Sequence, residues 1–317
     1  MMNENEFLLF DRLEKIKATV NQYGEDNCCI SFSGGKDSTV LHYMVDMALP
    51  NNHIPRVYAN TGIELNMIKN FVTKMSKYDY RIKMIKPSKS IRKTLEEFGY
   101  PFKSKEHSQR FMEYKKYGIQ QKHIQRYLGL WKRPNDTEET MKRYMCPAKL
   151  RYQFTDEFCK NGLDISDECC KKMKEEPIRN WQIENNRLVT ITGIMQDEGG
   201  RRNTTPCISH KPKGIINFNP LTVITKEFEQ WFIYKYNIEI CDIYKPPYNL
   251  ERTGCKGCPF NINLEKDLEM LGKYFPAERE QCEYIWKPVY DEYRRLGYRL
   301  KGDDNIEGQI SLFDILD

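Results

Sequence analysis

Short apolar runs typical of strands alternate with longer stretches of helical spacing along the first third of the chain. The apolar positions nearest the N-terminus recur at intervals of three and four residues, which predicts a helix over 7–20. These positions are Phe7, Phe10, Leu13, Ile16 and Val20. Three strand–helix pairs follow, predicted at 27–33 with 38–49, at 54–60 with 66–78, and at 80–87 with 90–100. This alternation predicts an α/β fold with a doubly wound parallel sheet covered by helices on both faces.

The alternation stops at about residue 101. Residues 101–186 are mostly helical in pattern, polar and basic, so we interpret them as a helical insertion in the sheet domain. A strand pattern returns at 187–195, and an amphipathic helix follows at 226–237. From Cys241 onward the chain carries cysteines and ends in helical segments. We therefore expect a sheet domain over 1–240 that contains the insertion, and a cysteine-bearing C-terminal segment over 241–317.

Composition indicates a globular protein. Of the residues, 39% are hydrophobic, 12% aromatic and 30% charged, which is too apolar for a disordered chain. The apolar runs are too short to span a membrane, and the N-terminus lacks the basic-then-apolar layout of a signal peptide, so we expect a cytoplasmic location. The net charge of +5 supports an anionic ligand only weakly. In a reducing compartment, an odd count of 11 cysteines favours metal or redox chemistry over a disulfide framework.

A glycine loop joins the first predicted strand to its helix. It consists of Ser33, Gly34, Gly35, Lys36, Asp37 and Ser38. Glycines at this position let backbone N–H groups approach an anion, and the helix N-terminus adds partial positive charge. A Walker loop is excluded, because it needs four residues between its glycines and a Ser or Thr directly after the lysine. The segment therefore predicts a phosphate-binding loop, with an ordinary tight turn as the alternative.

The segment SFSGGKDS resembles the pyrophosphate-binding loop of the adenine nucleotide alpha-hydrolase (PP-loop ATP pyrophosphatase) superfamily, in the form typical of its phosphoadenosine phosphosulfate (PAPS) reductase family. The resemblance covers roughly residues 25–260 and implies a Rossmann-like sheet of the PP-loop/HUP type. It extends to YANTGIE, where Thr61 and Gly62 would line the nucleotide, and to GIMQDEGGRRN. The matching residues in the latter segment are Gly193, Glu198 and Arg202. Met195 stands where the family often has arginine.

The resemblance implies one of two ligands for the loop. With ATP, the loop amides and Lys36 would stabilise the departing pyrophosphate, and Asp37 would help to hold Mg²⁺. Lys36 and Asp37 are therefore the predicted catalytic residues. With PAPS, the same loop would hold the sulfate or phosphate groups. The loop alone does not choose between ATP and PAPS.

Four cysteines form two pairs that suit a single metal site. Cys169 and Cys170 are adjacent on a predicted helix that ends at Pro177. Cys255 and Cys258 form a CxxC turn far downstream. Adjacent helical positions diverge by about 100°, which suits the separate irons of a 4Fe-4S cluster better than one tetrahedral zinc ion. The pattern resembles the cluster cysteines of assimilatory adenylylsulfate reductases and sulfur-inserting relatives, with a structural zinc site as the alternative.

The catalytic cysteine that the family's reductases carry near the C-terminus, beside glycine and histidine, has no counterpart. Only Cys282 follows Cys258, and its surroundings, REQCEYIW, lack both neighbours. The leading hypothesis is therefore that ATP is cleaved to AMP and pyrophosphate to activate an acceptor, to which sulfur passes through the cluster or a cysteine. The alternatives are reduction of PAPS or adenylylsulfate to sulfite, and a non-catalytic nucleotide- or nucleic-acid-binding module.

Two further segments suggest macromolecular partners. Residues 103–126 interleave Lys and Arg with aromatic residues, which suits a nucleic-acid sulfur acceptor or equally a solvated helical face, where we expect His107. The C-terminal GQISLFDILD resembles the peptide by which bacterial replication and repair proteins dock on the sliding clamp. Its anchors would be Gln309, Leu312 and Phe313. A terminal helix packed on its own domain is the simpler interpretation.

Overall fold

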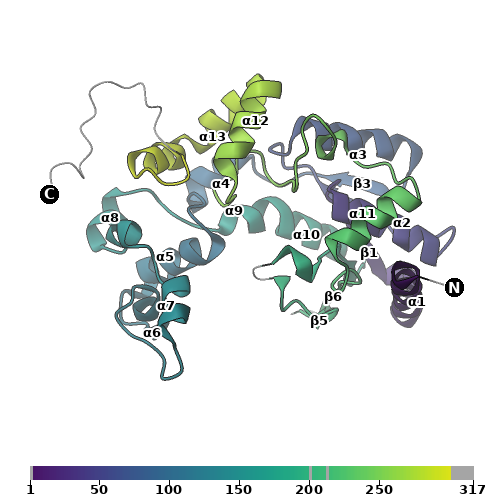
Figure 1. The fold of residues 1–317 in the computed structure, drawn as a ribbon, viewed down its shortest axis with the longest axis horizontal. Helices are drawn as coiled ribbons and strands as arrows, with labels where there is room; N and C mark the ends of the chain where they lie inside the picture. Colours follow the sequence, from purple (N-terminus) through teal and green to yellow (C-terminus); the bar gives the residue numbers. More distant parts are fainter. Residues whose placement is uncertain (1–2, 200–201, 212–213, 301–317) are drawn as a thin grey trace. The chain divides into compact units, whose positions relative to one another are not determined.

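The chain folds into two compact units, each made of two segments of sequence. The computed structural model describes residues 3–199, 202–211 and 214–300 (Figure 1). The first unit comprises Met1–Ile91 and Cys170–Lys256, and the second comprises Arg92–Cys169 and Gly257–Asp317. Every strand of the described residues belongs to the first unit, and the second unit is helical.

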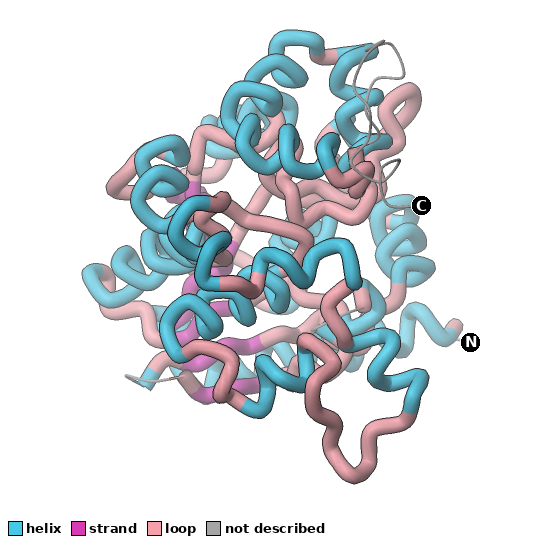
Figure 2. The backbone as a smooth tube through the Cα atoms, turned by 90° about the vertical axis from the view of Figure 1, so that its left-hand side faces the viewer, coloured by secondary structure: helices cyan, strands magenta, loops and turns pink. Residues whose placement is uncertain are grey.

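A six-stranded sheet in the order β3-β2-β1-β4-β6-β5 forms the centre of the first unit (Figure 2). The strands are β1 (Cys28–Ser31), β2 (Arg56–Ala59), β3 (Ile82–Ile85), β4 (Val189–Ile191), β5 (Ile208–His210) and β6 (Ile216–Phe218). Neighbouring strands are parallel except β5 and β6, which are antiparallel. The predicted α/β fold with a Rossmann-like, mostly parallel sheet is confirmed. Its strand order reverses between β1 and β4, and open sheets of this kind bind ligands at that switch point.

Five main helices accompany this sheet. They are α1 (Glu4–Tyr23), α2 (Lys36–Ala48), α3 (Asn66–Tyr78), α10 (Glu176–Glu184) and α11 (Lys226–Lys235). α1 begins with a capping box in which Asn3 and Glu6 satisfy each other's backbone N–H groups. The buried faces of α1, α2 and α11 form one hydrophobic core with β1 and β4. The helices predicted at 7–20, 38–49, 66–78 and 226–237 are confirmed to within a few residues at each end.

The second unit packs its helices around aromatic side chains. Its helices are α4 (Ile91–Phe98), α5 (Lys105–Tyr117), α6 (Lys122–Tyr127), α7 (Glu138–Tyr144), α8 (Asp156–Asn161), α9 (Glu168–Cys170), α12 (Leu264–Tyr274) and α13 (Pro276–Arg295). Edge-to-face ring contacts join Phe111 to Phe154 and Phe102 to Tyr293 of α13. The long segment 257–300 therefore shares a core with the residues inserted after β3.

His107 lies in this aromatic core, so the expectation of a surface position was wrong. Its side chain is fully buried, and its ring nitrogens contact Tyr127 Oη at 2.9 Å and Gln153 Oε1 at 2.8 Å. Burial, and then the nearby Lys103 charge, lower the pKa of His107 from 6.5 to about 3, although the hydrogen bond with Gln153 opposes this. The buried position of His107 was predictable from the sequence, because His107, Phe111 and Tyr114 share one face of α5.

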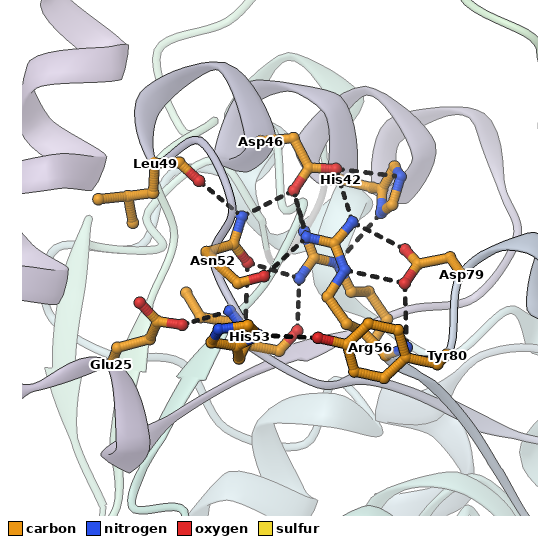
Figure 3. A network of polar contacts seen from close by, with 11 residues as sticks. Glu25, His42, Asp46, Leu49, Asn52, His53, Arg56, Asp79 and Tyr80 are labelled. Carbon is orange, nitrogen blue, oxygen red and sulfur yellow. Dashed lines mark hydrogen bonds and ion pairs between the residues drawn. The ribbon is translucent and has the colours of Figure 1, made fainter.

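A buried guanidinium ties the start of β2 to the end of α2 (Figure 3). Arg56 is fully buried, and its Nε donates to His42 Nδ1 at 3.1 Å. Its two Nη atoms donate to Asn52 Oδ1 at 2.8 Å and to Asp46 Oδ1 at 2.6 Å. Arg81, which precedes β3, donates to the same Asp46 oxygen at 2.7 Å. Since all three nitrogens of Arg56 have acceptors, the buried charge is compensated and joins three segments of the first unit.

Acid should destabilise the first unit through His42. Burial, and then the Arg56 charge, lowers the pKa of His42 from 6.5 to about 4, although Asp46 and Asp79 oppose this and Arg81 adds to it. The folded state keeps the ring neutral while the unfolded chain protonates it, so stability is complete above pH 6.5 and falls as the pH drops toward 4. At about 1.4 kcal/mol per pH unit, the loss is at most about 3 kcal/mol.

Urea unfolding of the wild type and of His42→Asn, from neutral pH to pH 4, measures this loss. Asparagine keeps an acceptor for Arg56 but does not titrate, so the free-energy gap between wild type and variant should shrink as the pH falls. The control is His53→Asn, because His53 is exposed at the edge of the same network. Parallel pH curves for wild type and His42→Asn would contradict the assignment.

Candidate active site

The glycine loop leaves β1 and enters α2 at the switch point of the sheet. Gly34 has a φ of +70°, and a side chain at this position would overlap Val72 of α3, so only glycine fits. α2 begins at Lys36, and its N-cap Gly35 supplies no side-chain cap to the first turn. The opening N–H groups of α2 and its dipole are therefore suited to an anionic ligand.

Hydroxyl side chains fix the shape of this loop. Ser38 Oγ donates to the Gly35 carbonyl at 2.9 Å and lies 3.0 Å from Ser33 Oγ. Thr39 Oγ1 donates to the same carbonyl at 2.9 Å. The predicted residues Ser33 and Ser38 are thus brought together, and the loop holds its shape through its own side chains.

Gly193 packs directly against the first turn of α2. It follows β4, the strand next to β1, and a Cβ atom at this position would lie 3.0 Å from the Asp37 carbonyl oxygen and 3.3 Å from the Ser38 nitrogen. Two predicted segments, the glycine loop and the segment after β4, therefore meet at the switch point. Close backbone approach is the physical reason for a glycine here.

Replacing Gly193 by alanine should weaken nucleotide binding by about tenfold, because the added methyl displaces the first turn of α2 by a few tenths of an ångström. Isothermal titration with ATP would measure the change. The control is Gly272→Ala, since Gly272 lies on α12 with no atom within 4 Å of its added Cβ. An unchanged dissociation constant in Gly193→Ala would contradict this placement of the site.

Glu229 on α11 is a site residue that the sequence analysis missed. Its side chain is 1% exposed, and Oε2 lies 2.8 Å from Lys36 Nζ. Burial raises the pKa of Glu229 to about 7, and the charge of Asp37 adds to this, whereas Lys36 opposes it. The predicted catalytic residues Lys36 and Asp37 therefore share their surroundings with a second carboxyl group, that of the buried Glu229.

Tyr244 also contacts the loop from a distant part of the sequence. Its hydroxyl accepts a hydrogen bond from the Lys36 backbone N–H at 3.2 Å and exchanges a second, short one with Thr253 Oγ1. Both oxygens lie near Gly35, where a Cβ atom would meet them at 3.3 and 3.4 Å. The proline-rich segment after α11, predicted only as a loop, thus braces the start of α2.

Thr61 and Gly62 lie after β2, one strand away from the glycine loop. Their backbone N–H groups donate to the two carboxylate oxygens of Glu64, at 3.1 and 3.0 Å. Thr61 is buried and Gly62 is exposed. The turn at the carboxyl end of β2 is therefore built on Glu64, with Gly62 at its accessible position.

Arg202 lies beside the predicted catalytic Asp37. Burial and the nearby Arg252 charge lower the pKa of Arg202, whereas Asp37 opposes this. Glu198 falls in a short 3-10 turn, Gln196–Glu198, and its side chain lies outside the described part of the structure. Met195 is 2% exposed and belongs to the hydrophobic core, which accounts for an apolar residue at this position.

Cys170 and Cys255 lie close together in the first unit, where Cys255 forms a β-bridge with Glu64. Burial raises the pKa of the Cys255 thiol, the Lys174 ammonium opposes this, and Cys170 and Glu64 add to it. A neighbouring ammonium stabilises the thiolate, which is the form that ligates metals. This pair of thiols therefore fits iron or zinc as a ligand set.

The other two predicted ligands, Cys169 and Cys258, belong to the second unit. Within residues 3–199, 202–211 and 214–300, no group of three or more Cys, His, Asp or Glu side chains is arranged to hold a metal ion. The assignment of all four cysteines to one site stays a prediction.

The helix that carries Cys169 and Cys170 does not end at Pro177, as the sequence suggested. A π-helical turn, Lys171–Glu175, links α9 to α10, and Pro177 lies in the first turn of α10. A proline is tolerated in a first turn because its missing N–H is not needed there, and single π turns are common at functional sites.

The basic insertion is partly neutralised within its own unit. Arg110 and Lys115 form ion pairs with Glu113 and Asp164. Lys103 donates to Tyr127 Oη at 3.1 Å, and burial lowers the pKa of Lys103.

The predicted clamp-docking residues Gln309, Leu312 and Phe313 lie outside the described residues. No described helix is both long and apolar enough to cross a membrane.

Fold and site together define an α/β protein with a glycine loop that suits an anion at the switch point of a mostly parallel sheet. The family model for the phosphoadenosine phosphosulfate reductase domain matches residues 27–133 and 130–261, which is well over half of the chain. The chain belongs to this family, as the resemblance implied, and the family is one of adenine-nucleotide enzymes. No curated protein sequence matches the chain significantly.

Three solved structures with a similar arrangement are distant from this chain in sequence. A PAPS reductase from Candida auris, in a phosphate complex, is 11% identical, with 80% of this chain and 96% of that chain covered and a TM-score of 0.40. Yeast FAD synthetase with FAD is 11% identical, with 77% and 64% covered and a TM-score of 0.42. The U34-tRNA thiolase NcsA from Methanococcus maripaludis, with its 4Fe-4S cluster, is 16% identical, with 97% and 85% covered and a TM-score of 0.39.

Proposed function

We propose that the chain cleaves ATP to AMP and pyrophosphate in order to activate an acceptor for sulfur transfer. An acceptor oxygen attacks the α-phosphorus, pyrophosphate leaves, and a sulfur nucleophile then displaces AMP from the adenylated acceptor. The observation that carries the proposal is the convergence of positive charge at the start of α2. Lys36 opens this helix and Arg202 lies beside Asp37 at its first turn.

Each part of this site has a defined task. The N–H groups of the glycine loop and of the first turn of α2 bind the β and γ phosphates. Lys36 and Arg202 neutralise the charge that grows on the departing pyrophosphate. Asp37, with Mg²⁺, orients the phosphates for in-line attack. Since these groups are fixed before the ligand binds, little reorganisation is needed during the reaction.

The burial of Cys282 favours ATP over PAPS as the substrate. Cys282, which alone follows Cys258, is fully buried on α13, and its sulfur packs against Gly257. A buried packing thiol does not suit the role of a reductase nucleophile, which must reach the sulfur of its substrate. Reduction of PAPS or adenylylsulfate to sulfite stays the second candidate, because the matching family model is named for it.

The proposal assigns a 4Fe-4S cluster to Cys169, Cys170, Cys255 and Cys258, with zinc as the alternative. Such a cluster, when bound, supplies sites for sulfur binding or electron transfer. On the protein side, Lys174 lies against Cys255 and favours its thiolate form. A nucleic acid is the proposed acceptor, since the insertion that begins at Lys103 is basic.

Product analysis on anaerobically purified protein tests this function. ATP labelled in its α-phosphate would be incubated with Mg²⁺, a sulfide source, and either bulk tRNA, sheared DNA or no nucleic acid. The proposal expects AMP and pyrophosphate in equal amounts, with turnover raised by one of the nucleic acids. Formation of ADP, or of sulfite from PAPS in a parallel reaction without any AMP from ATP, would overturn it.

A further inference from the structure

Glu229 is a buried carboxyl group whose charged form its surroundings compensate poorly. It sits on the apolar face of α11, next to the fully packed Phe228 and one turn before Phe232. Its ion pair with Lys36 spans 2.8 Å, yet within the described residues neither carboxylate oxygen accepts a hydrogen bond of normal geometry. An ionised carboxylate is costly to bury without hydrogen bonds, so its retention in this core face calls for a ligand.

A second carboxylate lies beside it. Asp37 acts on Glu229 through its charge, and the ammonium of Lys36 pairs with Glu229. Arg202 also lies near Asp37, but Arg252 repels it there. Two neighbouring carboxylates are a typical setting for a hard divalent ion.

Nucleotide binding would weaken the ion pair between Lys36 and Glu229. Phosphate groups at the start of α2 attract Lys36, which heads that helix, and so compete with Glu229 for its ammonium. Glu229 would then be buried beside Asp37 without its ion-pair partner, which is strongly unfavourable. A divalent cation that enters with the phosphates removes the conflict, since it neutralises both carboxylates and bridges them to phosphate oxygens.

We propose that Glu229 and Asp37 together bind the divalent cation that accompanies the nucleotide, and that Lys36 occupies the position of this cation beside Glu229 until the phosphates arrive. The inference rests on the proposed function for the identity of the nucleotide, and it assigns to Glu229 a role that the glycine loop alone does not reveal. The site accepts Mg²⁺ or Mn²⁺, because its protein ligands are oxygen atoms.

Mn²⁺ binding measured by electron paramagnetic resonance tests this site without any turnover. The ligand is the α,β-methylene analogue of ATP, which cannot be cleaved between its α and β phosphates. Glu229→Gln should weaken Mn²⁺ binding in the presence of the analogue by at least about tenfold, and Glu229→Asp by less. The matched control is Glu227→Gln, an exposed glutamate on the same helix, which should bind Mn²⁺ like the wild type. Wild-type Mn²⁺ affinity in Glu229→Gln would overturn the proposal and leave Glu229 only the positioning of Lys36.

A second variant separates this inference from the proposed function. Lys36→Met removes the competing ammonium, so the nucleotide-free variant should bind Mn²⁺ at least about tenfold more tightly than the wild type. Adding Glu229→Gln to Lys36→Met should abolish that gain. If the analogue fails to bind the wild type, the proposed function fails. The Mn²⁺ affinity of nucleotide-free Lys36→Met still decides on the cation site, because that measurement needs no nucleotide. No gain of Mn²⁺ affinity in folded Lys36→Met would overturn the inference.

Discussion

Lys36→Ala is expected to lower the rate of AMP formation from ATP by about 100- to 1,000-fold, the usual cost of losing one preorganised stabilising group. Lys36 opens α2 directly after the glycine loop, and its side chain is only 20% exposed. In the proposed reaction its ammonium neutralises charge that develops as pyrophosphate leaves, so the loss should fall mainly on kcat rather than on KM. Steady-state kinetics with labelled ATP would measure both constants.

Two companion variants make this result specific. Lys36→Arg keeps the charge but changes its shape and reach, so it should recover part of the activity. Lys235→Ala removes a lysine of the same unit that pairs with Glu6 at the surface, and it should leave kcat unchanged. Thermal unfolding must show that Lys36→Ala remains folded, because it leaves Glu229 buried without its ion-pair partner. A folded Lys36→Ala variant with wild-type kcat would refute the role of Lys36 in catalysis.

Cys255→Ser is expected to remove the iron–sulfur cluster. Serine rarely replaces a cluster thiolate, and Cys255 is the proposed ligand that lies beside both Cys170 and Lys174. Iron and acid-labile sulfide should fall from about four atoms of each per chain to below about one, and the visible absorption of the anaerobic protein should disappear. Cys207→Ser is the matched control, since Cys207 is a half-buried cysteine of the same unit outside both pairs.

Metal analysis of the wild type also separates the two metals under consideration. Zinc at about one atom per chain, without iron or sulfide, would replace the cluster with the structural alternative. Full retention of iron in Cys255→Ser would exclude this cysteine as a ligand.

The parts of the fold that the sequence predicted are those with strong local signals. Gly34 and Gly35 stand between an apolar run and a helical pattern, and this order of residues gave both the α/β fold and the position of the loop. β5 and β6 were missed because their three residues each are mostly half-buried or exposed, whereas the equally short β4 is fully buried within the predicted apolar segment 187–195. The antiparallel edge of the sheet therefore appeared only in the structure.

The site residues that the sequence analysis missed lie far from the glycine loop in the sequence. Tyr244 and Glu229 reach the glycine loop from beyond residue 220, and each resembles an ordinary member of a loop or an amphipathic helix in the sequence. A signal did exist for Glu229, because it lies beside Phe228 on the face of α11 that is otherwise apolar. An acidic residue on an apolar helical face should be treated as a candidate site residue.

The central claim is that this member of the PAPS reductase domain family acts on ATP, and a binding competition tests it most directly. Anaerobically purified protein would be titrated with ATP and Mg²⁺ in the presence of PAPS, and then in the reverse order. The account predicts that ATP binds more tightly and displaces PAPS, and that Gly193→Ala weakens ATP binding. Tighter binding of PAPS, undisturbed by ATP and Mg²⁺, would contradict the account and make reduction the function to pursue.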